Sequence, residues 1–225
     1  MVESSSFELG AELAHARGDP SPSAERGDAR ASRARGEPEV LLLLLEQHQR
    51  FDKLLAVLEA EVIALGRGDD PDFDLLRDVF FYMTRFPDRV HHPLEDLAFE
   101  KLAERAPDLR PRCVELHRQH QDLAARGAAF SQRLEDALRG RRIVRRDAIE
   151  QPAREYVELF RGHMDAEERQ VFPACRQHLT AADWDELRDR VQSEDDPLFG
   201  GRVQATYQRL HRQIVRAADC DCAVG

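Results

Sequence analysis

Histidine and glutamate residues recur in this chain with a constant spacing. Four histidines and two glutamates form two sets with one offset between them: His48, His91 and Glu95, then His120, His163 and Glu167. Imidazole nitrogens and carboxylate oxygens together are ligands for hard to borderline metal ions, with iron the leading candidate. Histidines scattered over a surface would have no reason to keep this register. The spacing therefore predicts a metal centre assembled from two equivalent halves.

The residues next to these candidates repeat with the same offset. The matching stretches are Gln47-His48-Gln49 with Gln119-His120-Gln121, and Glu95-Asp96 with Glu167-Glu168. In each half a histidine is followed four residues later by a glutamate, and residues four apart share one face of a helix. Two halves facing each other would give two metal positions, with Glu95 and Glu167 placed to bridge them.

Four amphipathic helices must position these side chains. Apolar residues recur at steps of three and four in four segments: from Val40 to a stop at Gly66, from about Asp72 to Ala106, from Cys113 to a stop at Gly140, and from Ile149 to Glu167. The ligand candidates occupy the apolar stripes, where a polar side chain is costly unless a partner satisfies it. Four histidines, one per helix, therefore indicate a shared cation in the interior. No segment has a convincing strand pattern, and we predict an all-α fold.

Composition limits the classes of protein that fit. The chain has 225 residues, 34% of them charged, and a net charge of −10, which argues against a nucleic-acid or anionic-membrane surface. Its apolar run Leu41–Leu45 is too short to span a bilayer, and the polar N-terminus does not resemble a signal peptide. We expect a cytoplasmic protein with a flexible segment over 1–38, a helical bundle over 39–178 and a C-terminal helical extension over 179–225.

Several of these motifs together resemble the hemerythrin-like, HHE cation-binding proteins. The resemblance covers about Val40 to His178 and rests on His48, Phe86-Pro87-x-x-x-His91-His92-Pro93-x-Glu95-Asp96, Gln119-His120, and His163-x-x-x-Glu167-Glu168-x-x-x-Phe172-Pro173. It implies an antiparallel up-down four-helix bundle around two iron ions in an oxo- or hydroxo-bridged centre. Carried over by position, the terminal ligands would be His48, His91, His120 and His163, with Glu95 and Glu167 bridging.

The resemblance also implies a range of functions. Members bind oxygen, sense iron or oxygen, handle nitric oxide or peroxide, or help repair damaged iron centres. We expect this chain to bind or sense O2, NO or peroxide, in oxidative or nitrosative stress or in iron homeostasis. The alternative is a di-iron enzyme that consumes peroxide or NO, or a repair protein. No nucleic acid or membrane partner is expected, and the sequence does not identify a protein partner.

One departure from the oxygen-carrying hemerythrins affects the expected function. Those proteins have five histidines, including a His-x-x-x-His pair on the third helix, whereas this chain has Leu116 four residues before His120 and Ala124 four residues after it. The chain thus looks like the subgroup with four histidines and two glutamates, and oxygen carriage is the less expected role. His92 and His117 are the neighbours that could fill a fifth position, although a supporting or solvated role is favoured for both.

Two other classes of metal protein fit less well. Ferritin-type bundles use Glu-x-x-His on two helices, and the only match, Glu12-x-x-His15, lies in the segment expected to be flexible. A structural zinc site takes four ligands, often thiolates, and six candidates without cysteine are too many. Cys113 and Cys175 fall in helical patterns and are expected to be buried, while Cys220-Asp221-Cys222 is expected to be an exposed terminus.

The sequence leaves open whether the centre turns its ligand over. Tyr82 and Tyr156 are candidate redox neighbours, although Tyr156 more simply belongs to the core. Gly127 leaves room for a ligand or allows close helix packing. Pro93, between two ligand candidates, marks a helix break or the N-terminal turn of a second segment, or it distorts the helix so as to aim the ligands, and these interpretations are compatible. The segment from Thr180 onward is expected to form helices that cover one end of the bundle rather than a partner-binding module.

Overall fold

The structure is a computed structural model that describes residues 38–140, 145–191, 196–200 and 203–221. All regular elements within these ranges are helical. The expected flexible segment, apart from residue 38, lies outside the described residues, and so does the Glu12-x-x-His15 motif. The Cys220-Asp221-Cys222 prediction also falls where no side chain is described.

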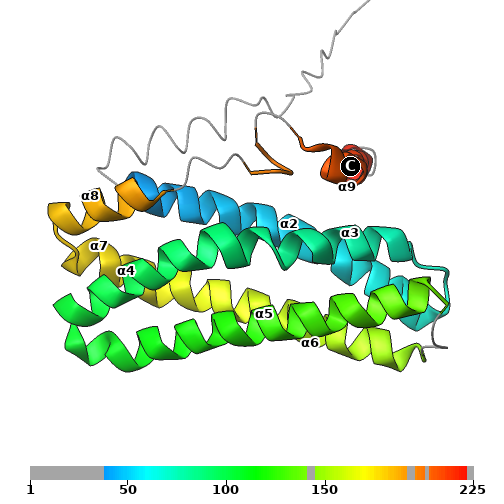
Figure 1. Ribbon diagram of the computed structural model, residues 1–225, viewed down its shortest axis with the longest axis horizontal. Coiled ribbons are helices and arrows are strands. Elements are labelled where there is room, and N and C mark those ends of the chain that lie inside the picture. The colour runs from blue at the N-terminus through cyan, green and yellow to red at the C-terminus, as the bar shows by residue number, and fades with distance from the viewer. Residues whose placement is uncertain (1–37, 141–144, 192–195, 201–202, 222–225) are drawn as a thin grey trace, which may run out of the picture. The chain divides into compact units, whose positions relative to one another are not determined.

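Four long helical rods lie side by side (Figure 1). They are α2 (Glu39–Arg67); α3 (Phe73–Met83), η1 (Pro87–His91) and α4 (His92–Arg105); α5 (Arg110–Leu138); and α6 (Asp147–Ala166), η3 (Glu167–Val171) and α7 (Phe172–His178). The short 3-10 turn η2 (Pro107–Leu109) connects α4 to α5. Each rod packs against the next in the chain, and α6 returns to α2. The predicted all-α, antiparallel up-down four-helix bundle is confirmed.

Glycine ends two of the helices, but one end was predicted wrongly. The first helix continues through Gly66 and stops at Gly68, whose φ of 88° is left-handed and whose N–H donates to the Leu65 carbonyl. A residue with a side chain is strained in that conformation, so the second glycine of Gly-Arg-Gly is the better stop. The predicted stop at Gly140, with a φ of 62°, is confirmed.

Proline widens two of the rods without breaking them. The π-helical turn η1 ends two residues before Pro93, and η3 ends two residues before Pro173. Proline has no N–H and its ring crowds the carbonyl four residues earlier. The widened turns relieve this conflict, because the N–H of His92 reaches Pro87 and that of Phe172 reaches Glu167, each five residues back. Pro93 therefore lies in the first turn of α4, directly after the widened turn, so the expected N-terminal turn of a second segment and the expected distortion are both present.

Two further helices follow the bundle. Thr180 and Asp183 form a reciprocal capping box that begins α8 (Ala181–Arg190), as the sequence predicted. Arg105 donates to the Asp183 carboxylate and ties α8 to α4. After the 3-10 turn η4 (Ala205–Tyr207), α9 (Gln208–Asp221) contacts α2 and α3. No helix in the described ranges is long and apolar enough to cross a membrane.

The interior consists of two apolar clusters with a polar layer between them. One cluster contains residues such as Phe51, Phe80 and Phe130, and the other contains residues such as Leu44 and Phe99. Along each rod, the segment that joins the two clusters carries buried polar side chains: Gln47, His48, His91, His92, Glu95, His120, His163 and Glu167. The bundle therefore isolates this layer from solvent on both sides.

Candidate metal centre

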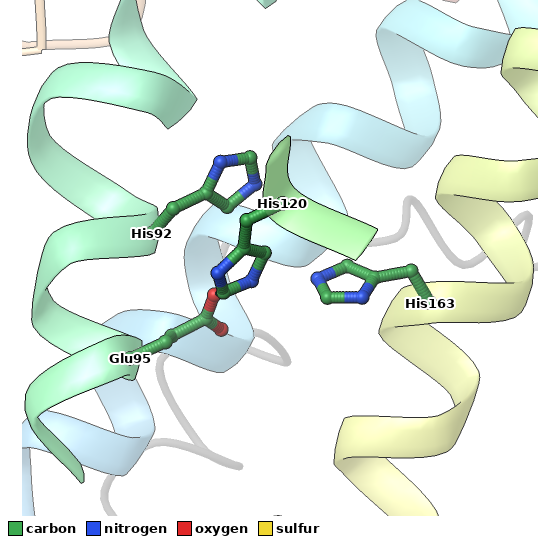
Figure 2. Close-up of side chains that lie close together, drawn as sticks. All are labelled: His92, Glu95, His120 and His163. Carbon is green, nitrogen blue, oxygen red and sulfur yellow. The ribbon is translucent and has the colours of Figure 1, made fainter. Parts of the chain in front are cut away.

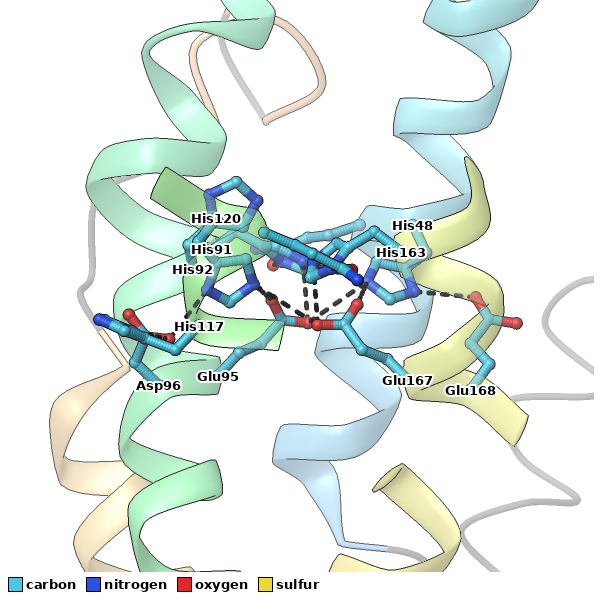
Figure 3. A network of polar contacts seen from close by, with 12 residues as sticks. His48, His91, His92, Glu95, Asp96, His117, His120, His163, Glu167 and Glu168 are labelled. Carbon is cyan, nitrogen blue, oxygen red and sulfur yellow. Dashed lines mark hydrogen bonds and ion pairs between the residues drawn. The ribbon is translucent and has the colours of Figure 1, made fainter. Parts of the chain in front are cut away.

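The six predicted ligands lie together in the polar layer. His48 comes from α2, His91 and Glu95 from the junction of η1 and α4, His120 from α5, and His163 and Glu167 from the junction of α6 and η3. All six side chains are buried, and both glutamates are completely inaccessible. Figure 3 shows the two carboxylates in the middle, with imidazoles arranged around them. The sequence therefore identified residues that the fold brings together.

The first donor set contains His48, His91 and one oxygen from each glutamate. The Nε2 atoms of His48 and His91 are 3.1 Å apart. They lie 3.3 and 3.0 Å, respectively, from Oε1 of Glu95. Nε2 of His48 is also 3.5 Å from Oε2 of Glu167. Two nitrogens and two oxygens thus face one another.

The second donor set repeats this geometry with the other oxygens. Nε2 of His163 lies 3.0 Å from Oε1 of Glu167, and Nε2 of His120 lies 3.5 Å from the same atom. Nε2 of His120 is also 3.4 Å from Oε2 of Glu95. Each glutamate therefore gives one oxygen to each set, and the constant offset in the sequence corresponds to an approximate two-fold relation between the sets.

These separations match ligands of a shared ion. Two ligands at right angles, each about 2.1 Å from a metal ion, are about 3 Å apart. Both oxygens of Glu95 and Glu167, and Nε2 of His120 and His163, are buried without a hydrogen-bond partner among the described residues. Buried polar atoms without partners are costly. A cation in each donor set would satisfy them, so the residues fit a pair of metal ions.

The outer nitrogens of two histidines are held by glutamine. Nδ1 of His91 donates to Oε1 of Gln47 at 2.7 Å, and Nδ1 of His163 donates to Oε1 of Gln119 at 3.1 Å. A glutamine oxygen only accepts, so it places the proton on Nδ1 and leaves the Nε2 lone pair facing the donor set. The two glutamines are related by the same offset as the ligands, and the repeated Gln-His words already contained this signal.

The other two histidines are held by carboxylates. Nδ1 of His48 donates to Oε1 of Glu168 at 2.8 Å, and Nδ1 of His120 donates to Oδ1 of Asp96 at 2.8 Å. Asp96 and Glu168 also occupy equivalent positions in the two halves of the repeat. A carboxylate behind an imidazole orients the ring and makes it a better metal ligand. Sequence reasoning recorded these repeated neighbours but assigned them no role.

Comparison with known proteins agrees with this geometry. The Hemerythrin HHE cation binding domain matches residues 40–175. This chain belongs to the hemerythrin HHE family. It is also similar to the uncharacterized protein Rv1995 of Mycobacterium tuberculosis and the uncharacterized protein Mb2018 of Mycobacterium bovis, with 25% identity over 186 residues that cover 81% of this chain and 69% of each relative. No solved structure matches the chain. The predicted family and bundle are thus confirmed.

The buried carboxylates of this hemerythrin-like centre change the pKa values of the imidazoles around them, and the imidazoles change theirs. Burial lowers the pKa of His48, but the carboxylates of Glu168 and Glu95 outweigh burial and raise it to about 10. Burial also lowers the pKa of His120, but the carboxylates of Asp96 and Glu167 outweigh burial and raise it to about 11. Burial raises the pKa values of Glu95 and Glu167, yet the surrounding imidazoles hold both below the ordinary value. In each donor set one imidazole, His48 or His120, thus has its pKa raised by neighbouring carboxylates.

The two histidines considered for a fifth position have different environments. His92 is buried beside the second donor set, and burial lowers its pKa to about 4. Of the two expected roles, supporting or solvated, burial excludes the solvated one for His92. His117 is 52% exposed, and its Nδ1 lies 2.9 Å from Oδ1 of Asp96, which fits the expected supporting role. Leu116 is completely buried in an apolar cluster and provides no donor.

The residues considered as redox neighbours or as space for a ligand have structural roles. The hydroxyl of Tyr82 donates to Oδ2 of Asp196 at 3.0 Å, and Tyr156 is buried against Phe80. A Cβ on Gly127 would lie 2.5 Å from Cγ2 of Thr84, so this glycine permits close helix packing rather than leaving room for a ligand.

The cysteines within the bundle are also buried. Cys113 and Cys175 lie in the apolar cluster of Leu44 and Phe99, as predicted.

Proposed function

We propose that this chain binds two iron ions in the two donor sets. His48 and His91 would be terminal ligands of the first ion, and His120 and His163 those of the second. Glu95 and Glu167 would each bridge the pair. The observation that supports the proposal is the division of each carboxylate, with one oxygen at each set at 3.0–3.5 Å from the imidazole nitrogens.

The chemistry of the donors favours iron over zinc. Structural zinc sites usually take four ligands and often include thiolates, whereas these sets combine imidazole and carboxylate and contain no cysteine. Each set offers two nitrogens and two oxygens. An iron ion that takes six ligands would keep positions for a bridging oxygen and for one small external ligand.

The surroundings suit a small ligand. The apolar clusters on both sides of the layer restrict water and larger polar solutes, and admit small neutral molecules. We propose that residues 39–178 carry the centre, which binds or senses O2, NO or peroxide in oxidative or nitrosative stress or in iron homeostasis. Reversible oxygen carriage in the hemerythrins uses a fifth histidine. Leu116 provides no such ligand, which argues against oxygen carriage as the role of this chain.

Metal analysis with an optical spectrum tests the proposal. Protein produced with abundant iron should contain about two irons per chain and show the charge-transfer bands of a bridged iron pair. A chain that folds normally with one zinc ion, or with no metal, contradicts the proposal. Peroxide and nitric-oxide consumption by the wild type and by Glu167→Ala then separates an enzyme from a sensor.

A further inference from the structure

His92 is a buried histidine that the symmetric ligand set does not use. It is 4% exposed, and its Nδ1 faces Oδ1 of Asp88 at 3.2 Å. Its Nε2 is buried without a hydrogen-bond partner among the described residues. Leaving a buried nitrogen unpaired is costly, which indicates a partner that arrives with the metal or the ligand.

The position of His92 associates it with one donor set. Its ring is nearly parallel to that of His120, with an interplanar angle of 13° and ring centroids 4.1 Å apart. Its donor atom lies within 4.8 Å of those of Glu95, His120 and His163. Figure 2 shows the His92 ring above that of His120, on the side away from Glu95. His92 thus borders the second donor set without joining its close contacts.

The repeat gives the first donor set no equivalent group. The counterpart of His92 in the second half of the repeat is Met164, whose thioether is only a weak hydrogen-bond acceptor. The two donor sets are therefore alike in ligands but unlike in their neighbours. A ligand bound at the second set meets an imidazole that the first set lacks.

The partner of Nδ1 decides what Nε2 can do. The Asp88 carboxylate only accepts, so the proton of the neutral imidazole lies on Nδ1 and the lone pair on Nε2. An Nε2 lone pair accepts a hydrogen bond from an O–H group. Hydrogen peroxide and water have such a group, whereas O2 and NO have none.

We propose that His92 accepts a hydrogen bond from hydrogen peroxide bound at the His120 and His163 position, with water in its place at rest. The proposal rests on the proposed metal pair and narrows its ligand class to protonated oxygen species. His92 acts here as a ligand-positioning residue, and its removal should weaken peroxide binding without removing metal.

The test compares two probes on the iron-loaded full chain. Hydrogen peroxide carries the required proton, and the azide anion does not. Dissociation constants for both are obtained from the absorbance change of the iron centre, before turnover in the case of peroxide. The variants are His92→Leu and His92→Phe, which lack the nitrogen, His92→Gln, which keeps an acceptor, and Met164→Leu as the matched control from the other half.

We expect two irons per chain in every variant. His92→Leu and His92→Phe should weaken peroxide binding about tenfold and change azide binding less than about twofold. His92→Gln should recover part of the loss, and Met164→Leu should match the wild type for both probes. If one apolar variant fails to fold, the other carries the comparison.

Four outcomes overturn the proposal. Unchanged peroxide binding in the apolar variants removes the role of His92, and equal weakening of both probes shows a general disturbance. If the His92 variants lose iron and Met164→Leu does not, His92 is a metal ligand and not a ligand-positioning residue. A wild-type chain without iron overturns the metal pair itself, and this result is distinguishable because it appears before any substitution is made.

Discussion

The two donor sets present the same atoms at nearly the same distances, but their surroundings differ. The shortest nitrogen to oxygen contact is 3.0 Å in both sets. Beside them, His92 in the first half of the repeat corresponds to Met164 in the second. Metal coordination tolerates little variation in ligand type and spacing, whereas the neighbours of the ligands can change. Two ions in these sets would therefore be held by like ligands but would meet unlike neighbours.

Removal of either bridging glutamate should have the largest effect on metal content, and the effect should be the same for both glutamates. Because Glu95 and Glu167 each serve both donor sets, we expect Glu95→Ala and Glu167→Ala to lose both metal ions. Metal content, measured by elemental analysis, should fall from about two ions per chain to well below one. A matched control is Asp52→Ala, four residues after His48, because Asp52 is 60% exposed and pairs with Arg161. Retention of two ions in either glutamate variant would contradict shared bridging.

Metal affinity should increase steeply with pH. In the metal-free chain the pKa is raised to about 10 for His48 and about 11 for His120, so both imidazoles are protonated at neutral pH. Each must release its proton to bind metal, and lower proton concentration favours that release. Between pH 6 and 8 the apparent affinity for the pair should rise on the order of 100-fold per pH unit, measured by chelator competition. A pH-independent affinity would show that these imidazoles do not bind the metal.

Removal of the carboxylates behind His48 and His120 should lower metal affinity by different amounts in the two halves of the repeat. Asp96→Asn and Glu168→Gln remove the charge behind His120 and His48, and such changes cost about 10- to 100-fold in metal affinity. Asp96 is 26% exposed and Glu168 is 43% exposed, so water screens the second interaction more. We expect Asp96→Asn to have the larger effect in chelator competition. Equal effects, or a larger effect of Glu168→Gln, would contradict this ranking.

Much of the centre could be predicted from sequence because it repeats. The ligands lie at fixed spacings on apolar stripes, so periodicity and one repeated offset located His48 and His120 without a structure. The role of Asp96 depends on which side chain of another helix it meets, and spacing alone does not give that contact. The stop at Gly68 rather than Gly66 depends on backbone conformation, which two glycines separated by one residue do not reveal.

His92 shows the main limit of the sequence reasoning. Its helix position placed it beside the stripe and left a supporting and a solvated role open. The π-helical turn η1 ends at His91 and changes the direction of the residues that follow it. Local widening of a helix depends on packing around Pro93 as well as on the proline itself, so the burial of His92 required the structure.

The smallest expected effect is on stability and concerns the close packing of α5 at Gly127. A methyl group added at Gly127 would lie 2.5 Å from Cγ2 of Thr84, and the hydroxyl of Thr84 is held by the Phe80 carbonyl at 2.7 Å. We expect Gly127→Ala to lower the free energy of unfolding by about 1 kcal/mol, measured by chemical denaturation. In a Thr84→Ser background, which removes the methyl group, the same change should be neutral or stabilising. Destabilisation of equal size in both backgrounds would refute the close packing.

Anomalous diffraction from crystals of the iron-loaded chain tests the central claim most directly. We predict two iron peaks about 3–4 Å apart, one beside His48 and His91 and the other beside His120 and His163. Glu95 and Glu167 should each contact both peaks. A single peak, or two peaks that share neither glutamate, would contradict the account.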